Sequence, residues 1–269
     1  MSKDLRWLQS YPGVKQWNLV EDNFLEPSMN IAIEELIGIE VGNGLLPPTL
    51  RLWRNRKKCF VLGSSYAKKF ASNPQRKGIF KAKGIDIVKK FSGGEAVFQD
   101  FSCLNFSITV PNGSRQGFAN IKDAFETLSS GVILALNRKG VHCQQTKVED
   151  TFCPGPYDIA IDNRKLAGVS MAWRSKFILV HGTLLVNADI DEYFKRIKEI
   201  YLYGPITRKI EKEKMSTLAI EKGEKINLNK LCDDIVEGYR GLFQIDFVKR
   251  KLSSKEKDIA EELKDKYRL

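Results

Sequence analysis

Hydrophobic positions along this chain change their spacing from one segment to the next. In residues 27–40 apolar side chains recur every three or four positions, and Pro27 suits the first turn of a helix. Residues 121–139 repeat this spacing, and Gly140 follows them as a stop. Runs rich in β-branched and aromatic residues between these helices predict strands. The expected strands cover residues 49–53, 59–62, 85–90, 95–99 and 104–110.

The second half of the chain begins with a strand meander and ends in charged helical segments. Three strand-like runs joined by short turns predict an antiparallel or mixed sheet. After Ala188 the spacing becomes helical, and Asp189 suits the first helix as a cap. We expect an α+β fold with a mixed or antiparallel central sheet flanked by helices. The expected strands are 157–162, 165–173 and 177–186, and the expected helices are 190–201, 227–243 and 253–267.

The length and composition of the chain favour one large domain, with or without a small appendage. The 269 residues are 42% hydrophobic, which is enough to bury a core of ordinary size. We place the core in residues 1–188 and expect residues 189–269 to form a helical segment packed on it. No apolar stretch approaches the roughly 20 residues that span a bilayer. The first ten residues include Lys3, Asp4 and Arg6, whereas an export signal peptide would have a hydrophobic core there. We therefore expect a cytoplasmic protein without a membrane partner.

The chain carries a formal charge of +11, and its basic residues are dense between Arg51 and Lys90. A basic surface attracts acidic partners, which include nucleic acid, anionic lipid and acidic carrier proteins. A lysine-rich solvated exterior explains the same composition. Charge alone does not choose among these partners.

Five cysteines at irregular spacing do not indicate a disulfide framework or a zinc finger. Most of them suit the role of small buried hydrophobes. The only histidines are His142 and His181, which excludes a multi-histidine metal centre, so we expect no metal site. His181 opens an apolar run, a position typical of a hydrogen-bonded core histidine.

The sequence Ser92-Gly93-Gly94 lies between two expected strands and follows Lys90. Glycines at such a place let backbone N–H groups approach a ligand closely, and the lysine adds positive charge beside it. A tight hairpin turn explains the same glycine pair without any ligand. The motif by itself leaves both interpretations open.

Cys153 leads a Pro-Gly-Pro turn, and Lys165 begins a later strand with Gly168 three residues on. A loop thiol near an ammonium group has the chemistry of a nucleophile. A glycine within a strand lets a ligand lie against the backbone. Taken separately, a lone cysteine is usually structural and a lone lysine usually lies on the surface.

These motifs together resemble those of one known family. Residues 90–100 with 104–107 resemble the glycine-rich acyl-binding motif of lipoate-protein ligases and octanoyltransferases. Residues 164–168 resemble the lysine motif of these enzymes, and residues 181–185 resemble the strand that follows it. The resemblance runs from about Trp17 to Asp189 and identifies the chain as a member of the biotin/lipoate ligase and transferase superfamily. It implies a class II biotin/lipoate ligase-like catalytic domain in residues 1–188.

Several residues bear on the subtype within this superfamily. Residues 153–158 resemble the cysteine motif of the octanoyl/lipoyl protein amidotransferase, in which that cysteine accepts the acyl group. ATP-dependent ligases such as lipoate-protein ligase A usually carry a third glycine at the position of Glu95, and a carboxylate would repel an adenylate phosphate. Gln99 stands where many ligases have histidine, and Lys89-Lys90 where they have paired arginines. Residues 181–183, however, look more like the ligases and another octanoyltransferase branch.

The resemblance implies an acyltransferase that moves an octanoyl or lipoyl group to a lysine of lipoyl domains. Cys153 would carry the acyl group as a thioester, and Lys165 would hold the acyl carbonyl and stabilise its oxyanion. The implied substrate-binding residues are Lys90, Ser92, Gly93, Gly94 and Gly168.

The implied partners are lipoyl-domain carriers, namely the glycine-cleavage H protein and E2 subunits, and the transfer needs no cofactor. One alternative is an ATP-dependent lipoate-protein ligase that forms a lipoyl-adenylate with ATP and Mg²⁺. Another is a nucleic-acid-binding module, which leaves the glycine and lysine motifs without a role, so we expect no nucleic-acid partner.

Overall fold

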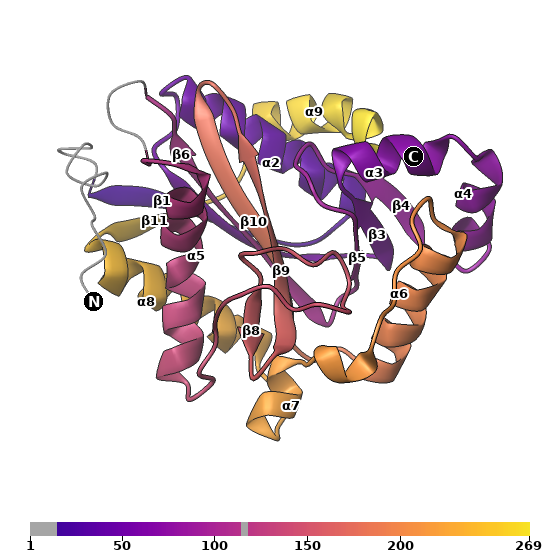
Figure 1. The fold of residues 1–269 in the computed structure, drawn as a ribbon. Helices are drawn as coiled ribbons and strands as arrows, with labels where there is room; N and C mark the ends of the chain where they lie inside the picture. Colours follow the sequence, from indigo (N-terminus) through magenta and orange to yellow (C-terminus); the bar gives the residue numbers. More distant parts are fainter. Residues whose placement is uncertain (1–14, 114–117) are drawn as a thin grey trace.

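A large mixed sheet and a small sheet organise the protein (Figure 1). The computed structural model describes residues 15–113 and 118–269. The eight strands of the large sheet follow the order β11-β1-β2-β6-β10-β9-β8-β7, in which β1 runs parallel to β2 and β11 and the other neighbours are antiparallel. These strands are β1 (Gln16–Leu25), β2 (Thr49–Asn55), β6 (Cys103–Pro111), β7 (Gln144–Gln145), β8 (Ile159–Ile161), β9 (Arg164–Trp173), β10 (Phe177–Leu185) and β11 (Asp246–Arg250). The small sheet has the order β4-β3-β5, with β3 (Cys59–Leu62), β4 (Asp86–Lys89) and β5 (Ala96–Gln99).

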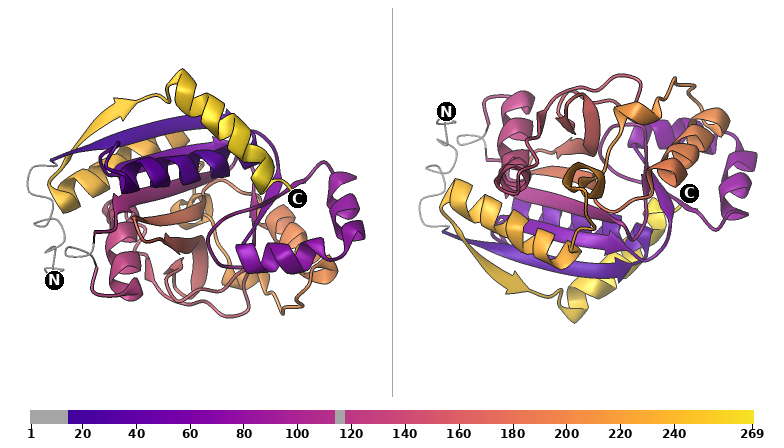
Figure 2. Two further views of the ribbon diagram at one scale, coloured as in Figure 1. Left: turned by 90° about the horizontal axis from the view of Figure 1, so that it is seen from above. Right: turned by 90° about the horizontal axis from the view of Figure 1, so that it is seen from below.

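Helices pack against both sheets. Helix α9 lies alongside α2, as the left view of Figure 2 shows, and α5 packs on α8. Helices α3, α4 and α6 gather around the small sheet. The helices are α2 (Pro27–Gly42), α3 (Ser64–Ala71), α4 (Pro74–Lys81), α5 (Ile121–Arg138), α6 (Ile190–Tyr203), α7 (Leu218–Lys222), α8 (Leu228–Phe243) and α9 (Ser254–Leu263), with 3₁₀ turns at η1 (Lys212–Lys214) and η2 (Lys264–Tyr267).

Alternation along the central strands gives the large sheet one apolar and one polar face. In β6, Leu104, Phe106 and Ile108 join the core formed with α5 and α8. The residues between them, Asn105 and Ser107, are buried as well. Because successive side chains of a strand point to opposite faces, these polar groups face the side of α2. A ligand that enters between α2 and the sheet therefore meets buried hydrogen-bonding groups.

The expected α+β fold with a mixed central sheet and flanking helices is confirmed. The Asp189 side chain accepts from the N–H groups of Asp191 and Glu192, so it caps α6 as predicted. Strand β1 and helices α3 and α4 were not predicted. Polar residues 21–23 interrupt the apolar positions of β1, and α3 and α4 have only 8 residues each, which is too short for a clear helical spacing. In the part of the chain that the structure describes, no helix is long and apolar enough to cross a membrane.

The C-terminal segment contains more than the expected helices. Residues 246–250 form β11, which pairs in parallel with β1 and extends the large sheet. The boundary at residue 188 stays a prediction.

The basic run between residues 51 and 90 is not uniformly a surface feature. The Arg51 side chain is fully buried, donates to the backbone oxygen of Asn30 at 2.9 Å and pairs with Asp22 at 3.2 Å. Lys90 is also buried. These two charges lie inside the fold, whereas the basic residues between them are exposed or half-buried. Lys57, Lys58 and Lys83 among them pair with glutamates of the same chain.

Candidate active site

A cavity of about 360 Å³ opens between α2, the central strands and the loop that carries Cys153. Pockets of 300–1,000 Å³ with apolar walls and a few polar groups are typical of small-molecule sites. The apolar wall includes Ile31, Trp53, Val97 and Phe125. Among the residues expected at the site, Lys90, Gly93, Gly94, Cys153 and Gly168 line this cavity.

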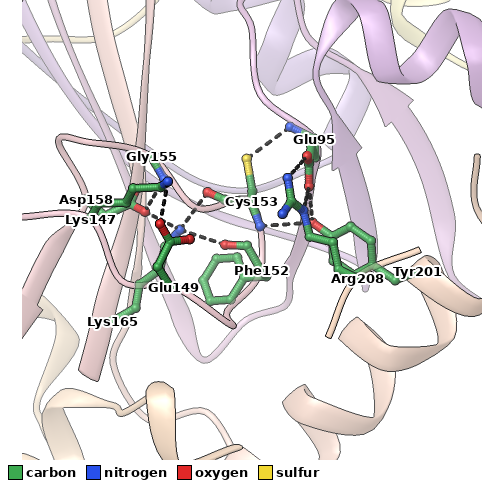
Figure 3. A network of polar contacts seen from close by, with 10 residues as sticks. All are labelled: Glu95, Lys147, Glu149, Phe152, Cys153, Gly155, Asp158, Lys165, Tyr201 and Arg208. Atoms are coloured by element: carbon green, nitrogen blue, oxygen red, sulfur yellow. Dashed lines mark hydrogen bonds and ion pairs between the residues drawn. The ribbon is translucent and has the colours of Figure 1, made fainter. Parts of the chain in front are cut away.

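Cys153 is held in an unusual backbone conformation by contacts at three of its atoms (Figure 3). Its φ angle is 41°, in the left-handed region that non-glycine residues rarely adopt. Its N–H donates to the Tyr201 hydroxyl at 2.9 Å, and its carbonyl oxygen accepts from Lys165 Nζ at 2.9 Å. Its Sγ accepts from the backbone N–H of Glu95 at 3.0 Å. Such strain costs about 1–3 kcal/mol and persists at functional sites only where the surroundings impose it.

Lys165 supports the Cys153 loop from behind the cavity. Its side chain is fully buried, and Nζ donates to the carbonyl oxygens of Phe152 at 2.8 Å and Cys153 at 2.9 Å. Nζ also pairs with Asp158 Oδ2 at 2.7 Å, which engages the third N–H of the ammonium. Burial raises the pKa of Asp158, and Lys165 opposes that rise. In the structure Lys165 therefore positions the loop, and its contact with an acyl carbonyl stays a prediction.

The cation that shares the cavity with the Cys153 sulfur is Lys90. A Cβ atom built on Gly94 would lie 3.0 Å from Cys153 Sγ and 3.8 Å from Lys90 Nζ, so both atoms converge on this glycine. Burial lowers the pKa of the Lys90 ammonium, and the nearby Cys153 and Glu34 oppose this change. A lysine with a lowered pKa can exchange a proton with a reacting group more readily than a surface lysine.

Replacing Gly94 with alanine should slow acylation of the cysteine. The φ angle of Gly94 is 98°, so any side chain is strained there, and the new Cβ would press on the sulfur. We expect a stability loss of about 1–2 kcal/mol and a tenfold to roughly hundredfold slower reaction of the thiol with an acyl donor, because the sulfur is displaced. Thermal unfolding and time-resolved intact mass measure the two effects.

Gly44→Ala is the matched control for this variant. Gly44 also has a positive φ, 72°, but nothing lies within 4 Å of the place that its new Cβ would occupy. It should lose similar stability and keep the acylation rate. Equal acylation rates for both variants would contradict the role assigned to Gly94.

Glu95 is neutralised by an arginine from a distant segment (Figure 3). Arg208 Nε donates to its carboxylate at 2.6 Å, and the Tyr201 hydroxyl donates at 2.8 Å. Burial opposes ionisation of Glu95, but these partners together hold its pKa below the ordinary 4.5. Because Arg208 balances the charge, repulsion of a phosphate by Glu95 alone is a weaker argument against nucleotide binding than the sequence suggested.

Replacing Glu95 with glutamine should lower stability only where the carboxylate is ionised. A folded-state pKa below the unfolded value stabilises the protein above about pH 4.5, and this contribution disappears as the pH falls through the folded-state pKa. We expect a loss of about 1 kcal/mol at neutral pH, because Arg208 is one-third exposed and partly screened. Urea unfolding of both proteins, from neutral pH down to about pH 3, measures the difference in their free energies of unfolding. A difference that stays constant over this range would contradict the ion pair.

Ser92 and Lys165, the other residues expected at the site, do not line the cavity. Ser92 is buried, and its Oγ lies 2.7 Å from Nε2 of His181. His181 is buried with both ring nitrogens hydrogen-bonded, as its position in an apolar run predicted, and it also lines the cavity. A Cβ atom on Gly168 would lie 3.6 Å from Lys165 Nζ, so this glycine separates the lysine from the cavity.

Sequence reasoning missed several residues of the site. Glu34, Ser170, Tyr201 and Arg208 hold the turn, the histidine and the cysteine loop in place. Glu34 belongs to a helix that was recognised by its apolar spacing alone. Tyr201 and Arg208 lie in the C-terminal segment, and no local motif connects them with Cys153.

Comparisons with known proteins show which family this chain is similar to. The sequence pattern of the lipoyl protein ligase A/B catalytic domain family matches residues 26–240. The chain is 26% identical to the octanoyltransferase LipM of Clostridioides difficile, over 95% of this chain and 97% of that protein. It is 29% identical to an octanoyl-[GcvH]:protein N-octanoyltransferase of Kyrpidia tusciae, over 64% of this chain and 61% of that protein.

Solved structures share the fold. A lipoate-protein ligase A bound with ATP superposes with a TM-score of 0.72 at 22% identity, over 93% of this chain and 95% of that chain. A bipartite lipoate protein ligase from Thermoplasma acidophilum gives a TM-score of 0.70 at 20% identity, over 93% and 92% of the two chains. At these identities the comparison establishes the fold alone.

Proposed function

Because this chain belongs to the lipoyl protein ligase A/B catalytic domain family, we propose that it is a protein octanoyl/lipoyl transferase that works through a Cys153 thioester. The observation that carries this proposal is the Cys153 sulfur, which faces an apolar-walled cavity from a strained loop held at three atoms. A structural cysteine does not need such a conformation. Several relatives are named octanoyltransferases, which agrees with this chemistry.

The reaction has two steps. The Cys153 thiolate attacks the acyl carbonyl of the donor, the carrier group leaves, and the acyl chain stays on sulfur as a thioester. The amine of an acceptor lysine then attacks this thioester, so an amide forms and the thiolate is released. Passing from a thioester to an amide is downhill, so the second step needs no nucleotide.

Each residue around the sulfur has a distinct part in this mechanism. Lys90 Nζ and the Cys153 sulfur both lie close to Gly94, and burial favours the neutral amine of Lys90. This amine is placed to take up the thiol proton, which makes it an ammonium, and the ammonium then returns a proton to the leaving group. Charge that develops on the attacked carbonyl oxygen would be stabilised by Lys90 or, after a shift of its present contacts, by Lys165. The apolar walls hold the acyl chain.

We propose lipoyl-domain proteins as the partners. One relative is named for transfer from the protein GcvH, and one structural neighbour was studied with its E2 lipoyl domain. The glycine-cleavage H protein as donor or acceptor and an E2 lipoyl domain as acceptor suit a site in which a half-buried thiol lines the cavity. The exposed basic residues between positions 54 and 83 offer complementary charge to an acidic carrier.

Intact-mass analysis without nucleotide tests the proposal. The protein is mixed with octanoylated H protein or octanoyl-acyl carrier protein, beside a Cys153→Ser variant. We expect one octanoyl adduct on the wild type, and its loss after addition of a lipoyl domain, which gains the group. No adduct with either donor, together with ATP-dependent attachment of free lipoate that survives in the variant, would replace transfer by ligation.

A further inference from the structure

A second candidate nucleophile, the hydroxyl of Ser92, directly precedes Gly93 and Gly94 in the chain. Ser92 Oγ is 2.7 Å from Nε2 of His181, and Nδ1 of the same ring is 2.9 Å from Glu34 Oε1. All three side chains are at least nine-tenths buried. They come from the glycine turn, β10 and α2, so only the fold brings them together. A serine, an imidazole and a carboxylate in this order form the constellation that activates serine in hydrolases.

The hydrogen bonds determine which atom carries the proton. Glu34 Oε1 accepts, so the ring proton belongs on Nδ1 and Nε2 is left as an acceptor. Nε2 carries no proton in this tautomer, so the proton of the hydrogen bond between Ser92 and His181 must come from the Ser92 hydroxyl. The Ser170 hydroxyl lies 3.2 Å from Ser92 Oγ and 3.1 Å from the Gly93 oxygen, and its single proton can be donated to either of them. Ser92 is therefore polarised toward loss of its proton.

The next requirement is a donor for the oxyanion that forms during attack. In serine hydrolases the backbone N–H after the nucleophile often fills this role. Gly93 follows Ser92, and its N–H has no acceptor among residues 15–113 and 118–269. Gly93, Ser170 and His181 line the cavity, whereas the buried Ser92 does not, so an acyl carbonyl must pass between these three neighbours to reach the Ser92 hydroxyl.

From this geometry we propose that the protein also hydrolyses medium-chain acyl thioesters and esters through Ser92. Ser92 oxygen attacks the acyl carbonyl, His181 Nε2 takes the serine proton and passes it to the leaving thiolate or alkoxide, and an acyl-serine ester remains. Water then attacks this ester, with its proton taken by His181, and the carboxylic acid leaves as serine regains its hydrogen. Glu34 stabilises the imidazolium that forms in both steps.

This activity does not depend on Cys153, so it is tested in a Cys153→Ala protein. The substrate is p-nitrophenyl octanoate, and release of p-nitrophenolate is followed together with intact mass. We expect hydrolysis well above the buffer rate, and a fall of about a hundredfold or more on further replacement by Ser92→Ala or His181→Asn. An alkyl fluorophosphonate should label the same Cys153→Ala protein once, on the peptide that contains Ser92.

Ser129→Ala in the Cys153→Ala background is the matched control. Ser129 is a buried serine of α5 whose hydroxyl donates to a backbone oxygen, and it does not line the cavity. This change should leave hydrolysis and labelling unaltered. If Ser92→Ala fails to fold, the labelled peptide of the Cys153→Ala protein decides the question. Hydrolysis at the buffer rate, or a label on another residue, overturns the proposal and leaves the transfer mechanism untouched.

Discussion

Replacement of Cys153 by alanine is expected to lower the rate of octanoyl transfer between carriers by about 10⁴-fold or more, because removing a covalent nucleophile removes the whole acyl-enzyme route. The alanine side chain fits the space of the cysteine, so the far-ultraviolet spectrum and the melting temperature should change little. Steady-state transfer to a lipoyl domain, followed by mass spectrometry of the acceptor, measures the rate.

The control for this prediction is Cys232→Ala. Cys232 is the other half-buried cysteine of the protein, on α8 and outside the cavity. Its loss should leave transfer within about twofold of the wild type, as expected for a small substitution remote from the site. Transfer that persists in the Cys153 variant would show that the acyl group passes directly from donor to acceptor.

Lys165→Met should destabilise the protein and disable the site together. The methionine leaves Asp158 with a buried charge, and breaking a buried ion pair in this way costs about 3–5 kcal/mol. It also removes the two hydrogen bonds that hold the carbonyl oxygens of Phe152 and Cys153. We expect acylation of Cys153 to fall about a hundredfold or more, because a displacement of about 1 Å at the nucleophile has this effect.

A double variant separates the two consequences. Lys165→Met with Asp158→Asn removes the unpaired charge, so urea unfolding should recover a large part of the lost stability. The acylation rate should stay low, because the contacts to the cysteine loop are still absent. Recovery of acylation along with stability would mean that Lys165 acts on the fold and not on the position of Cys153. A stability loss below about 1 kcal/mol in the single variant would contradict the buried pair.

Much of the secondary structure could be predicted because it depends on local spacing. Helices α2 and α5 and the strands β3, β9 and β10 were expected within a few residues of their observed bounds. Strand β11 escaped prediction because its residues are mostly polar and it gains its strand character from pairing with β1 at the sheet edge. The register and burial of such a strand are set by a partner more than 200 residues away in sequence.

The sequence by itself determined the periodic elements, the cap at Asp189, the glycine turn and the candidacy of Cys153 and Lys165. The tertiary structure alone decided which groups meet. It placed Lys90 instead of Lys165 at the sulfur, set Arg208 against Glu95 across 113 residues, and joined His181 to Glu34 across 147. The physical reason is that spacing and turn preferences act within a few residues, whereas these contacts depend on sheet register and helix packing. A sequence motif can therefore indicate which residue is reactive, whereas the residues that contact it are known only from the tertiary structure.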